Sequence, residues 1–384
     1  MLKNLFSHVD QMLVVIILAL VSVGFVMMSS ASMDFASVEN GSPFFYIKRQ
    51  LVFIAFASFI AFVCFCLPTD FWNRHGMKFL GAGMMLLVLV LLVGKEVNGS
   101  KRWIPLGVIN LQASEFAKIF ILIYIASYLE RRQAEVREKW SGFLKAALVL
   151  SAASFLLILE PDFGATVVLL ISAVGMVFLA GLGLQQVFVS VVLVLVGVVA
   201  AIFGASYRLQ RLSCFADPWA EAYDCGYQLV QSLIAFGRGE FFGLGLGKSI
   251  QKLFFLPEAH TDFVFAIIAE ELGFIGAVAV IGLFVSLIYK IFSIALRAEA
   301  AHKLFAAYFA YGIGLLLSAQ VFINIGVNSG LLPTKGLTLP LLSYGGSSLV
   351  AMAIMLGILL RIDTDLRGVT AKSSSENLRG RRLA

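Results

Sequence analysis

Residues 165–183 read ATVVLLISAVGMVFLAGLG, an uncharged run that decides the fold class. A helix that spans a membrane needs about 20 mostly apolar residues, and this run has that length. Its apolar residues do not alternate with polar ones, as they would in the strands of a membrane β-barrel. The run therefore predicts a transmembrane helix.

The whole chain shares this apolar character. Of its 384 residues, 60% are hydrophobic and 14% are charged, and the mean hydropathy is +0.93. Soluble domains carry roughly 45–50% apolar and about 25% charged residues. We therefore expect an all-α integral membrane protein, a polytopic bundle of about ten transmembrane helices. The predicted spans are 11–32, 49–67, 79–94, 112–129, 143–159, 165–183, 187–205, 263–289, 304–327 and 347–361.

Basic residues gather in two places, which indicates how the chain crosses the membrane. Arg131, Arg132, Arg137 and Lys139 crowd one short loop, and the tail after Arg361 is also rich in Arg and Lys. Because cytoplasmic loops hold an excess of such residues, we expect both termini in the cytoplasm. The net charge of +6 then follows from topology and requires no nucleic-acid partner.

Residues 1–384 are expected to form a single membrane domain with two extramembrane segments. Residues 206–262 form a large external loop between the seventh and eighth spans, and residues 362–384 form a flexible basic cytoplasmic tail. Loops of such length are usually functional or disordered, and the aromatic and glycine content of this one argues against disorder. It is the first candidate for the active region.

Two features of this loop need separate interpretation. Cys214 and Cys225 could form a disulfide in an oxidising compartment, but their spacing alone leaves the bridge open. Residues 243–249 read GLGLGKS, which resembles a P-loop, yet Phe242 stands where that motif requires its first glycine. We interpret the segment as a close-packed re-entrant or interfacial turn.

Ionisable residues at membrane depth are costly, so they are natural candidates for function. Glu115 and Lys118 lie three residues apart at the start of the fourth span and therefore share a helix face. They form either a structural ion pair or part of a polar cavity. Asp162, in the turn EPDFG at 160–164, either caps the next helix or faces the same cavity.

Asp262 ends the motif PEAHTDF at 257–263, just before the eighth span. Asp262 or Thr261 could simply cap that helix. Alternatively, burial could raise the pKa of the Asp262 carboxyl so that it serves as a general base at neutral pH. Residues 330–348 break helix yet stay apolar, so we expect them to pack over the site.

Several cations lie on the external side, against the usual bias. Lys101 and Arg102 beside Trp103 are either interface anchors or ligands of a phosphate group. No Cys/His set has metal-ligand spacing. The other candidates for the cavity are Arg208, Arg211, Arg238 and His260 in the long loop.

Together these motifs resemble the SEDS family (shape, elongation, division and sporulation) along nearly the whole chain. Residues 333–340, PTKGLTLP, and Ala259 are similar to the division branch in Gram-negative bacteria rather than the elongation branch. Ala113 departs from the family, which usually has proline there. The resemblance rests on residues 98–104 (NGSKRWI), 160–164, 226–229 (GYQL), 231–235 (QSLIA), 237–240 (GRGE), 257–263, 270–273 (EELG) and 341–348 (LLSYGGSS).

The resemblance implies a peptidoglycan glycosyltransferase that polymerises lipid II into β-1,4 glycan strands on the periplasmic face of the inner membrane, at the division septum. It implies that Asp262 is the catalytic base and that Glu115, Lys118 and Asp162 line the cavity. The external cations would stabilise the pyrophosphate, directly or through a divalent cation such as Mg²⁺ or Mn²⁺, with no other cofactor. The implied partners are lipid II, the nascent glycan strand, a class B penicillin-binding transpeptidase and other divisome membrane proteins.

Two other functions fit the same composition. The protein could transport lipid II across the membrane as a flippase, or it could be a non-catalytic scaffold of the division machinery. The sequence favours an enzyme because its unusual residues concentrate on one side of the membrane instead of spreading through both leaflets.

Overall fold

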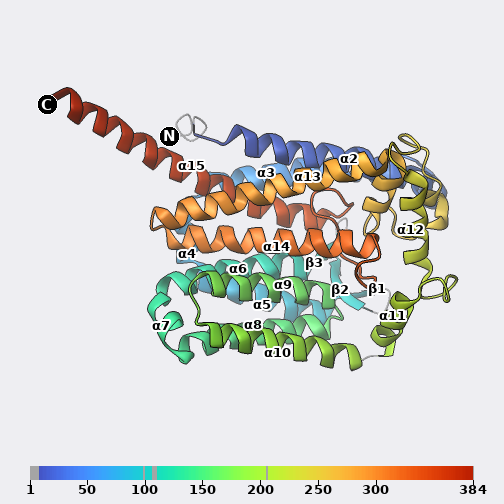
Figure 1. Ribbon diagram of the computed structural model, residues 1–384, viewed down its shortest axis with the longest axis horizontal. Coiled ribbons are helices and arrows are strands. Elements are labelled where there is room, and N and C mark those ends of the chain that lie inside the picture. Colours follow the sequence, from blue (N-terminus) through green and yellow to red (C-terminus); the bar gives the residue numbers. More distant parts are fainter. Residues whose placement is uncertain (1–7, 98–99, 106–109, 205, 384) are drawn as a thin grey trace.

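The structure is a computed structural model that describes residues 8–97, 100–105, 110–204 and 206–383, and it is a bundle of long helices (Figure 1). A helix lies over each of the ten predicted spans. These helices are α2 (Gln11–Asn40), α3 (Phe45–Cys66), α5 (Gly76–Val93), α6 (Ala113–Arg131), α8 (Trp140–Leu159), α9 (Phe163–Leu179), α10 (Leu184–Phe203), α13 (Val264–Ala300), α14 (Leu304–Asn328) and α15 (Gly346–Leu383).

The apolar character of these helices confirms a polytopic membrane bundle. Within the described residues, six helices are long and apolar enough to cross a membrane, namely α2, α3, α5, α8, α13 and α14. Helix α9 and the Leu184–Gly197 part of α10 are shorter apolar helices. The total of ten spans stays a prediction.

The two ends of the bundle differ. Helix α2 begins and α15 ends at one end, on the left of Figure 1, which we call the tail end. The opposite end, which we call the loop end, carries α11 (Ser206–Ala216) and α12 (Tyr227–Gly239). The predicted external loop thus contains two α-helices. Helix α15 runs on past the bundle to Leu383, and the flexibility expected for 362–384 stays a prediction.

A small sheet at the loop end is a departure from the all-α expectation. Strands β1 (Lys95–Val97), β2 (Ser100–Pro105) and β3 (Asn110–Gln112) are antiparallel in the order β1-β2-β3. The backbone N–H of Gln112 donates to Ser347 Oγ at 3.0 Å, which ties the sheet to the start of α15. The sheet thereby fixes the position of Arg102 on β2.

Helices α6 and α14 form the centre of the bundle and are buried on nearly every face. Helix α14 packs between α13 and α9, α5 packs on α6, and α15 packs on α3. The connecting elements are α4 (Thr69–Arg74), α7 (Gln133–Glu138) and the π-helical turn η1 (Gln251–Phe255).

Helix α13 is broken at Gly273, whose backbone has φ 68° and ψ −167°. A break leaves helix N–H and C=O groups without partners, and at membrane depth these must be satisfied by protein. The loop before α13 supplies the partners. Leu244 N–H donates to Glu270 O at 3.0 Å, and Phe274 N–H donates to Glu240 O at 2.8 Å. The glycine-rich turn predicted at 243–249 is therefore close-packed, and it completes the broken helix.

Ion pairs join three helices at the tail end. Asp10 caps α2 and accepts from Lys290 Nζ of α13 at 3.0 Å and from Arg367 of α15 at 2.5 Å. Asp363 of α15 pairs with Arg297 of α13 at 2.6 Å and with Arg367 at 2.8 Å. The start of α2 is therefore held against α13 and α15.

Candidate active site

Asp262 lies at the loop end, directly before α13. The residue at the N-cap position of α13 is Phe263, and neither it nor Asp262 caps the helix with its side chain. The Thr261 hydroxyl donates to Glu258 Oε2 at 2.6 Å instead. Asp262 is half-buried, and its carboxylate has no hydrogen bond or ion pair with any residue that the structure describes. The capping interpretation left open by the sequence is therefore wrong.

The backbone of Asp262 is held firmly although its carboxylate is free. Its carbonyl oxygen accepts from Asn324 Nδ2 at 2.9 Å and from Asn328 Nδ2 at 3.0 Å, both on α14. A Cβ atom added at Gly336 would lie 2.9 Å from Asp262 Oδ2, so the loop backbone closely approaches the carboxylate. The apolar loop therefore packs over the site as predicted. The two asparagines were missed, although polar residues spaced i, i+4 in an apolar span could have indicated them.

The environment of Asp262 suits a general base. The pKa of its carboxyl is raised to about 7, chiefly by burial and also by the negative charges of Glu258 and Asp162, whereas Arg102 and Arg211 oppose the shift. A carboxyl whose pKa lies near the working pH can both accept and release a proton. The same interactions show that the fold gathers Asp162, Arg102 and Arg211 around Asp262.

Arg102 and Glu160 form the wall of the site beside β2. Arg102 Nε donates to Glu160 O at 3.4 Å, and its Nη2 donates to Pro161 O. The Glu160 side chain is fully buried, and neither carboxyl oxygen has a hydrogen-bond partner. Burial raises the pKa of Glu160 to about 8, with Asp162 adding to the shift and Arg102 opposing it. Glu160 lies in the turn that the sequence analysis singled out, but the isolation of its carboxyl depends on packing and could not be predicted.

Asp162 links α6 to α9. Its Oδ1 accepts from Ala165 N–H at 3.2 Å, which caps α9, and its Oδ2 accepts from Ser114 Oγ at 2.8 Å. The predicted capping role is thus confirmed. The predicted ion pair is also present, because Lys118 Nζ lies 2.8 Å from Glu115 Oε1 and both side chains are almost fully buried. That these residues line a substrate cavity stays a prediction.

Two cations connect the site to the loop over it. Arg211 on α11 donates from Nη1 to Thr334 O at 3.3 Å. Lys335 Nζ lies 3.7 Å from the ring centroid of Phe163, next to Asp162, and the sequence had not suggested it as a site residue.

The other predicted cations have different surroundings. Lys101 is exposed on β2. Arg238 pairs with Glu270 at 3.1 Å, beside the break in α13. The side chain of Arg208 lies outside the described residues. The structure thus brings Arg102 and Arg211 to Asp262, and substrate contacts by the remaining cations stay predictions.

His260 lies in an aromatic cluster rather than among the charged groups. Its ring centroid is 5.3 Å from that of Phe35, 5.0 Å from that of Tyr46 and 5.9 Å from that of Tyr344. Burial lowers the pKa of its imidazole, which favours the neutral ring. Its carbonyl oxygen accepts from Tyr344 N–H at 2.9 Å. These contacts anchor the 257–262 segment, and a role for His260 in binding substrate stays a prediction.

A disulfide and the acidic residues complete the chemistry of the loop end. Cys214 and Cys225, whose Cα atoms are 6.0 Å apart, are bonded and tie α11 to the turn that precedes α12. The bridge that spacing had left open is thus present.

Among the described residues, no group of three or more His, Cys, Asp or Glu side chains could hold a metal ion.

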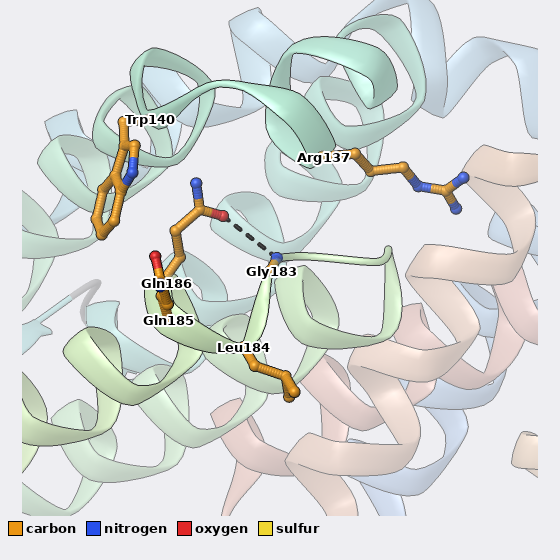
Figure 2. Close-up of a pocket in the computed structure, with 6 residues that line it drawn as sticks. All are labelled: Arg137, Trp140, Gly183, Leu184, Gln185 and Gln186. Atoms are coloured by element: carbon orange, nitrogen blue, oxygen red, sulfur yellow. Dashed lines mark hydrogen bonds between the residues drawn. The ribbon is translucent and has the colours of Figure 1, made fainter.

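A cavity of about 330 Å³ lies at the tail end, between α8 and α10 (Figure 2). Gly183 N–H donates to Gln186 Oε1 at 3.3 Å across its floor. Arg137 Nε donates to Ala180 O at 2.8 Å, and in Figure 2 its guanidinium points away from Trp140 and Gln186. The cavity therefore does not bring charged groups together, and the catalytic candidate is the Asp262 site.

The helix bundle and the site around Asp262 define a polytopic membrane protein with a carboxylate and cations gathered at one end. The chain belongs to the cell cycle protein family that groups FtsW, RodA and SpoVE, which it matches over residues 10–368. This confirms the SEDS resemblance.

Individual relatives and solved structures are consistent with this family. The chain is 50% identical over 365 residues to a probable peptidoglycan glycosyltransferase FtsW of Halomonas elongata, covering 93% of this chain and 91% of the relative. It is also 50% identical to the protein of that name from Hahella chejuensis, covering 95% of this chain and 92% of that relative. A peptidoglycan synthase complex that coordinates polymerization and crosslinking superposes with a TM-score of 0.78 at 31% identity, covering 93% and 98%. The rod shape determining protein RodA of Thermus thermophilus superposes with a TM-score of 0.69 at 32% identity, covering 93% of this chain and 97% of that structure.

Proposed function

We propose that this protein is a peptidoglycan glycosyltransferase that polymerises lipid II into β-1,4 glycan strands during septal cell-wall synthesis. The observation that carries the proposal is the free, half-buried carboxylate of Asp262 with a pKa of about 7. The names of the relatives, FtsW glycosyltransferases about 50% identical to this chain, support the same reaction.

In this reaction Asp262 is the general base. Its carboxylate accepts the proton of the 4-hydroxyl of the acceptor GlcNAc as that oxygen attacks the anomeric carbon of the MurNAc at the end of the growing strand. The bond from that carbon to the pyrophosphate oxygen breaks, and the electron pair leaves with the polyprenyl pyrophosphate. Inversion converts the α-linked donor into a β-1,4 linkage. Asp262 then releases its proton to water, which its near-neutral pKa permits.

Arg102 and Arg211 would stabilise the departing pyrophosphate. Their positive charges oppose the raised pKa of Asp262, which supports a role for both beside that carboxylate. Fixed cations aimed at developing negative charge are a strong source of transition-state stabilisation. The described residues provide no three-ligand metal cage, so a divalent cation such as Mg²⁺ or Mn²⁺ would arrive with the pyrophosphate.

We place the protein in the bacterial inner membrane, with the tail end in the cytoplasm and the loop end in the periplasm. The Lys and Arg of the 131–139 loop and of the C-terminal tail support this orientation. We propose that it concentrates at the division septum and works with a cognate class B penicillin-binding transpeptidase and other divisome membrane proteins. The similarity to a synthase complex that coordinates polymerization and crosslinking supports such a partner.

The test uses the purified protein with its transpeptidase partner and follows glycan formation from lipid II on gels. Asp262→Asn should retain folding and lose polymerisation by about 100-fold or more, because it removes the general base. Asp224→Asn is the matched control, since Asp224 is an exposed carboxylate at the same end. It should retain wild-type polymerisation.

Full polymerisation by Asp262→Asn would contradict the assignment. Wild-type protein that moves lipid II across vesicle membranes without forming glycan would indicate a transporter. Wild-type protein that does neither, yet binds its partner, would indicate a scaffold.

A further inference from the structure

Asn324 and Asn328 lie one helical turn apart on α14, so both side chains project from the same face. Both are buried, with exposed fractions of 2% and 0%. Burying an amide costs free energy unless its hydrogen bonds are made. The partners of these two amides therefore show which parts of the fold they hold.

The amide nitrogens converge on the segment that carries Asp262. Asn324 Nδ2 donates to Asp262 O at 2.9 Å and to Leu337 O at 2.5 Å. Asn328 Nδ2 donates to Asp262 O at 3.0 Å and to Asn324 O at 2.9 Å. One carbonyl oxygen thus accepts two side-chain donors. Through Leu337, Asn324 also holds the loop whose Gly336 closely approaches the carboxylate.

Asn328 also performs the task that a capping aspartate would perform. Its Oδ1 accepts from the N–H of Ala266, in the first turn of α13, at 3.1 Å. That turn has no side-chain cap of its own. Because α14 satisfies this donor, the carboxylate of Asp262 is not recruited to the helix start. The backbone is tethered, and the carboxylate stays free for chemistry.

We propose that Asn324 and Asn328 are positioning residues that hold the Asp262 backbone against the 331–345 loop and keep its carboxylate out of the helix cap. This inference rests on the proposed function, because it assigns the two amides to the general base of that reaction. Neither asparagine contacts the reacting atoms, and both act through Asp262.

Loss of the tether should change the acidity of Asp262 as well as the rate. A released carboxylate would turn toward water or toward the start of α13, and both environments favour its charged form. The pKa of Asp262 would then fall from about 7 toward the ordinary value for aspartate. Since a general base works when deprotonated, the acidic limb of the rate profile would move to lower pH while the plateau rate dropped.

The experiment measures polymerisation of lipid II between pH 5 and pH 9 by wild type, Asn324→Ala and Asn328→Ala. Each asparagine variant should shift the acidic limb down by about one pH unit and lower kcat with little change in KM.

Gln320→Ala is the matched control. Gln320 lies on the same helix, is equally buried, and donates to Thr338 O of the same loop at 3.1 Å without contacting Asp262. The acidic limb of the rate profile of Gln320→Ala should lie at the same pH as that of the wild type.

A second readout does not require activity. The thermal midpoint of each protein is compared with that of the same protein carrying Asp262→Asn as pH changes. A raised carboxyl pKa stabilises the fold at low pH, and that contribution is lost as pH rises from the ordinary aspartate pKa to about 7. In the asparagine variants this loss should be complete at a lower pH.

A uniform drop in rate at every pH, with both the acidic limb and the stability window unchanged, would overturn the positioning role. An equal shift in Gln320→Ala would overturn it as well. If wild type itself formed no glycan, the proposed function would fail, and the stability window would still decide whether the amides set the environment of Asp262.

Discussion

Two sets of carboxylates at the loop end of this protein contrast sharply. Glu270 and Glu271, beside the break in α13, are fully buried and surrounded by donors. Glu271 accepts from Lys252 Nζ at 3.0 Å and from Ser30 Oγ at 2.8 Å. Glu270 accepts from Arg238 Nε at 3.1 Å and from the backbone N–H groups of Ile250 and Gln251, where η1 begins. These charges fasten the glycine-rich turn to the broken helix.

Asp262 and Glu160 have the opposite arrangement. Neither carboxyl has a hydrogen bond or ion pair within the described part of the chain, and burial raises the pKa of both, to about 7 and about 8. Buried charge without partners costs free energy, so a fold keeps it where chemistry needs it. The contrast separates structural carboxylates from those of the site, and it can be tested.

The largest effect on stability is expected from breaking a fully paired charge. Lys252→Met should lower the free energy of unfolding by about 3–5 kcal/mol, because Glu271 would remain buried without its cation. Chemical unfolding of the detergent-solubilised protein measures this loss. Lys248→Met is the control, since Lys248 is exposed four residues earlier. Equal effects of the two substitutions would contradict a structural role for the pair.

A smaller, pH-dependent effect is expected at the unpaired Glu160. Its raised pKa means that the protonated form stabilises the fold, and this contribution is lost as pH rises from the ordinary glutamate value to about 8. Glu160→Gln mimics the protonated form, so its Tm should exceed that of wild type by a margin that grows across this window, reaching about 2–4 °C or more. Tm values at pH 5, 7 and 9 measure the margin, with the exposed Glu221→Gln as control. A margin independent of pH would show that the carboxyl is solvated.

The smallest effect is expected at the exposed pair of Lys145 and Glu135, whose atoms lie 2.6 Å apart. Water and salt screen such pairs, and ordering two long side chains offsets the attraction. Lys145→Met should leave the Tm unchanged within error. A loss of stability comparable to that of Lys252→Met would show that the exposed ion pair contributes as much as the buried one. Burial would then not decide how much an ion pair stabilises the fold.

Local spacing accounts for the features that could be predicted from the sequence. The apolar runs predicted the ten helices, since length and composition decide whether a segment suits the bilayer. The Glu115–Lys118 pair followed from helical periodicity, because residues three apart share a face wherever the helix lies. The SEDS resemblance of its motif suggested Asp262 as the catalytic base, and that role stays a prediction.

Contacts between distant segments explain what could not be predicted. The tether from Asn324 and Asn328 crosses 62 and 66 residues, and the isolation of Glu160 depends on which atoms pack around it. The sequence also allowed Asp262 to cap α13, and only the position of α14 removed that role.

The amino-acid sequence alone therefore specifies a membrane-embedded helical bundle and where its few charges lie along the chain, because bilayer thickness and helical periodicity act over short stretches. Only the packed bundle decides which of those charges find partners. Whether a buried carboxylate is neutralised, like Glu271, or left free to titrate, like Asp262, depends on donors brought from remote segments.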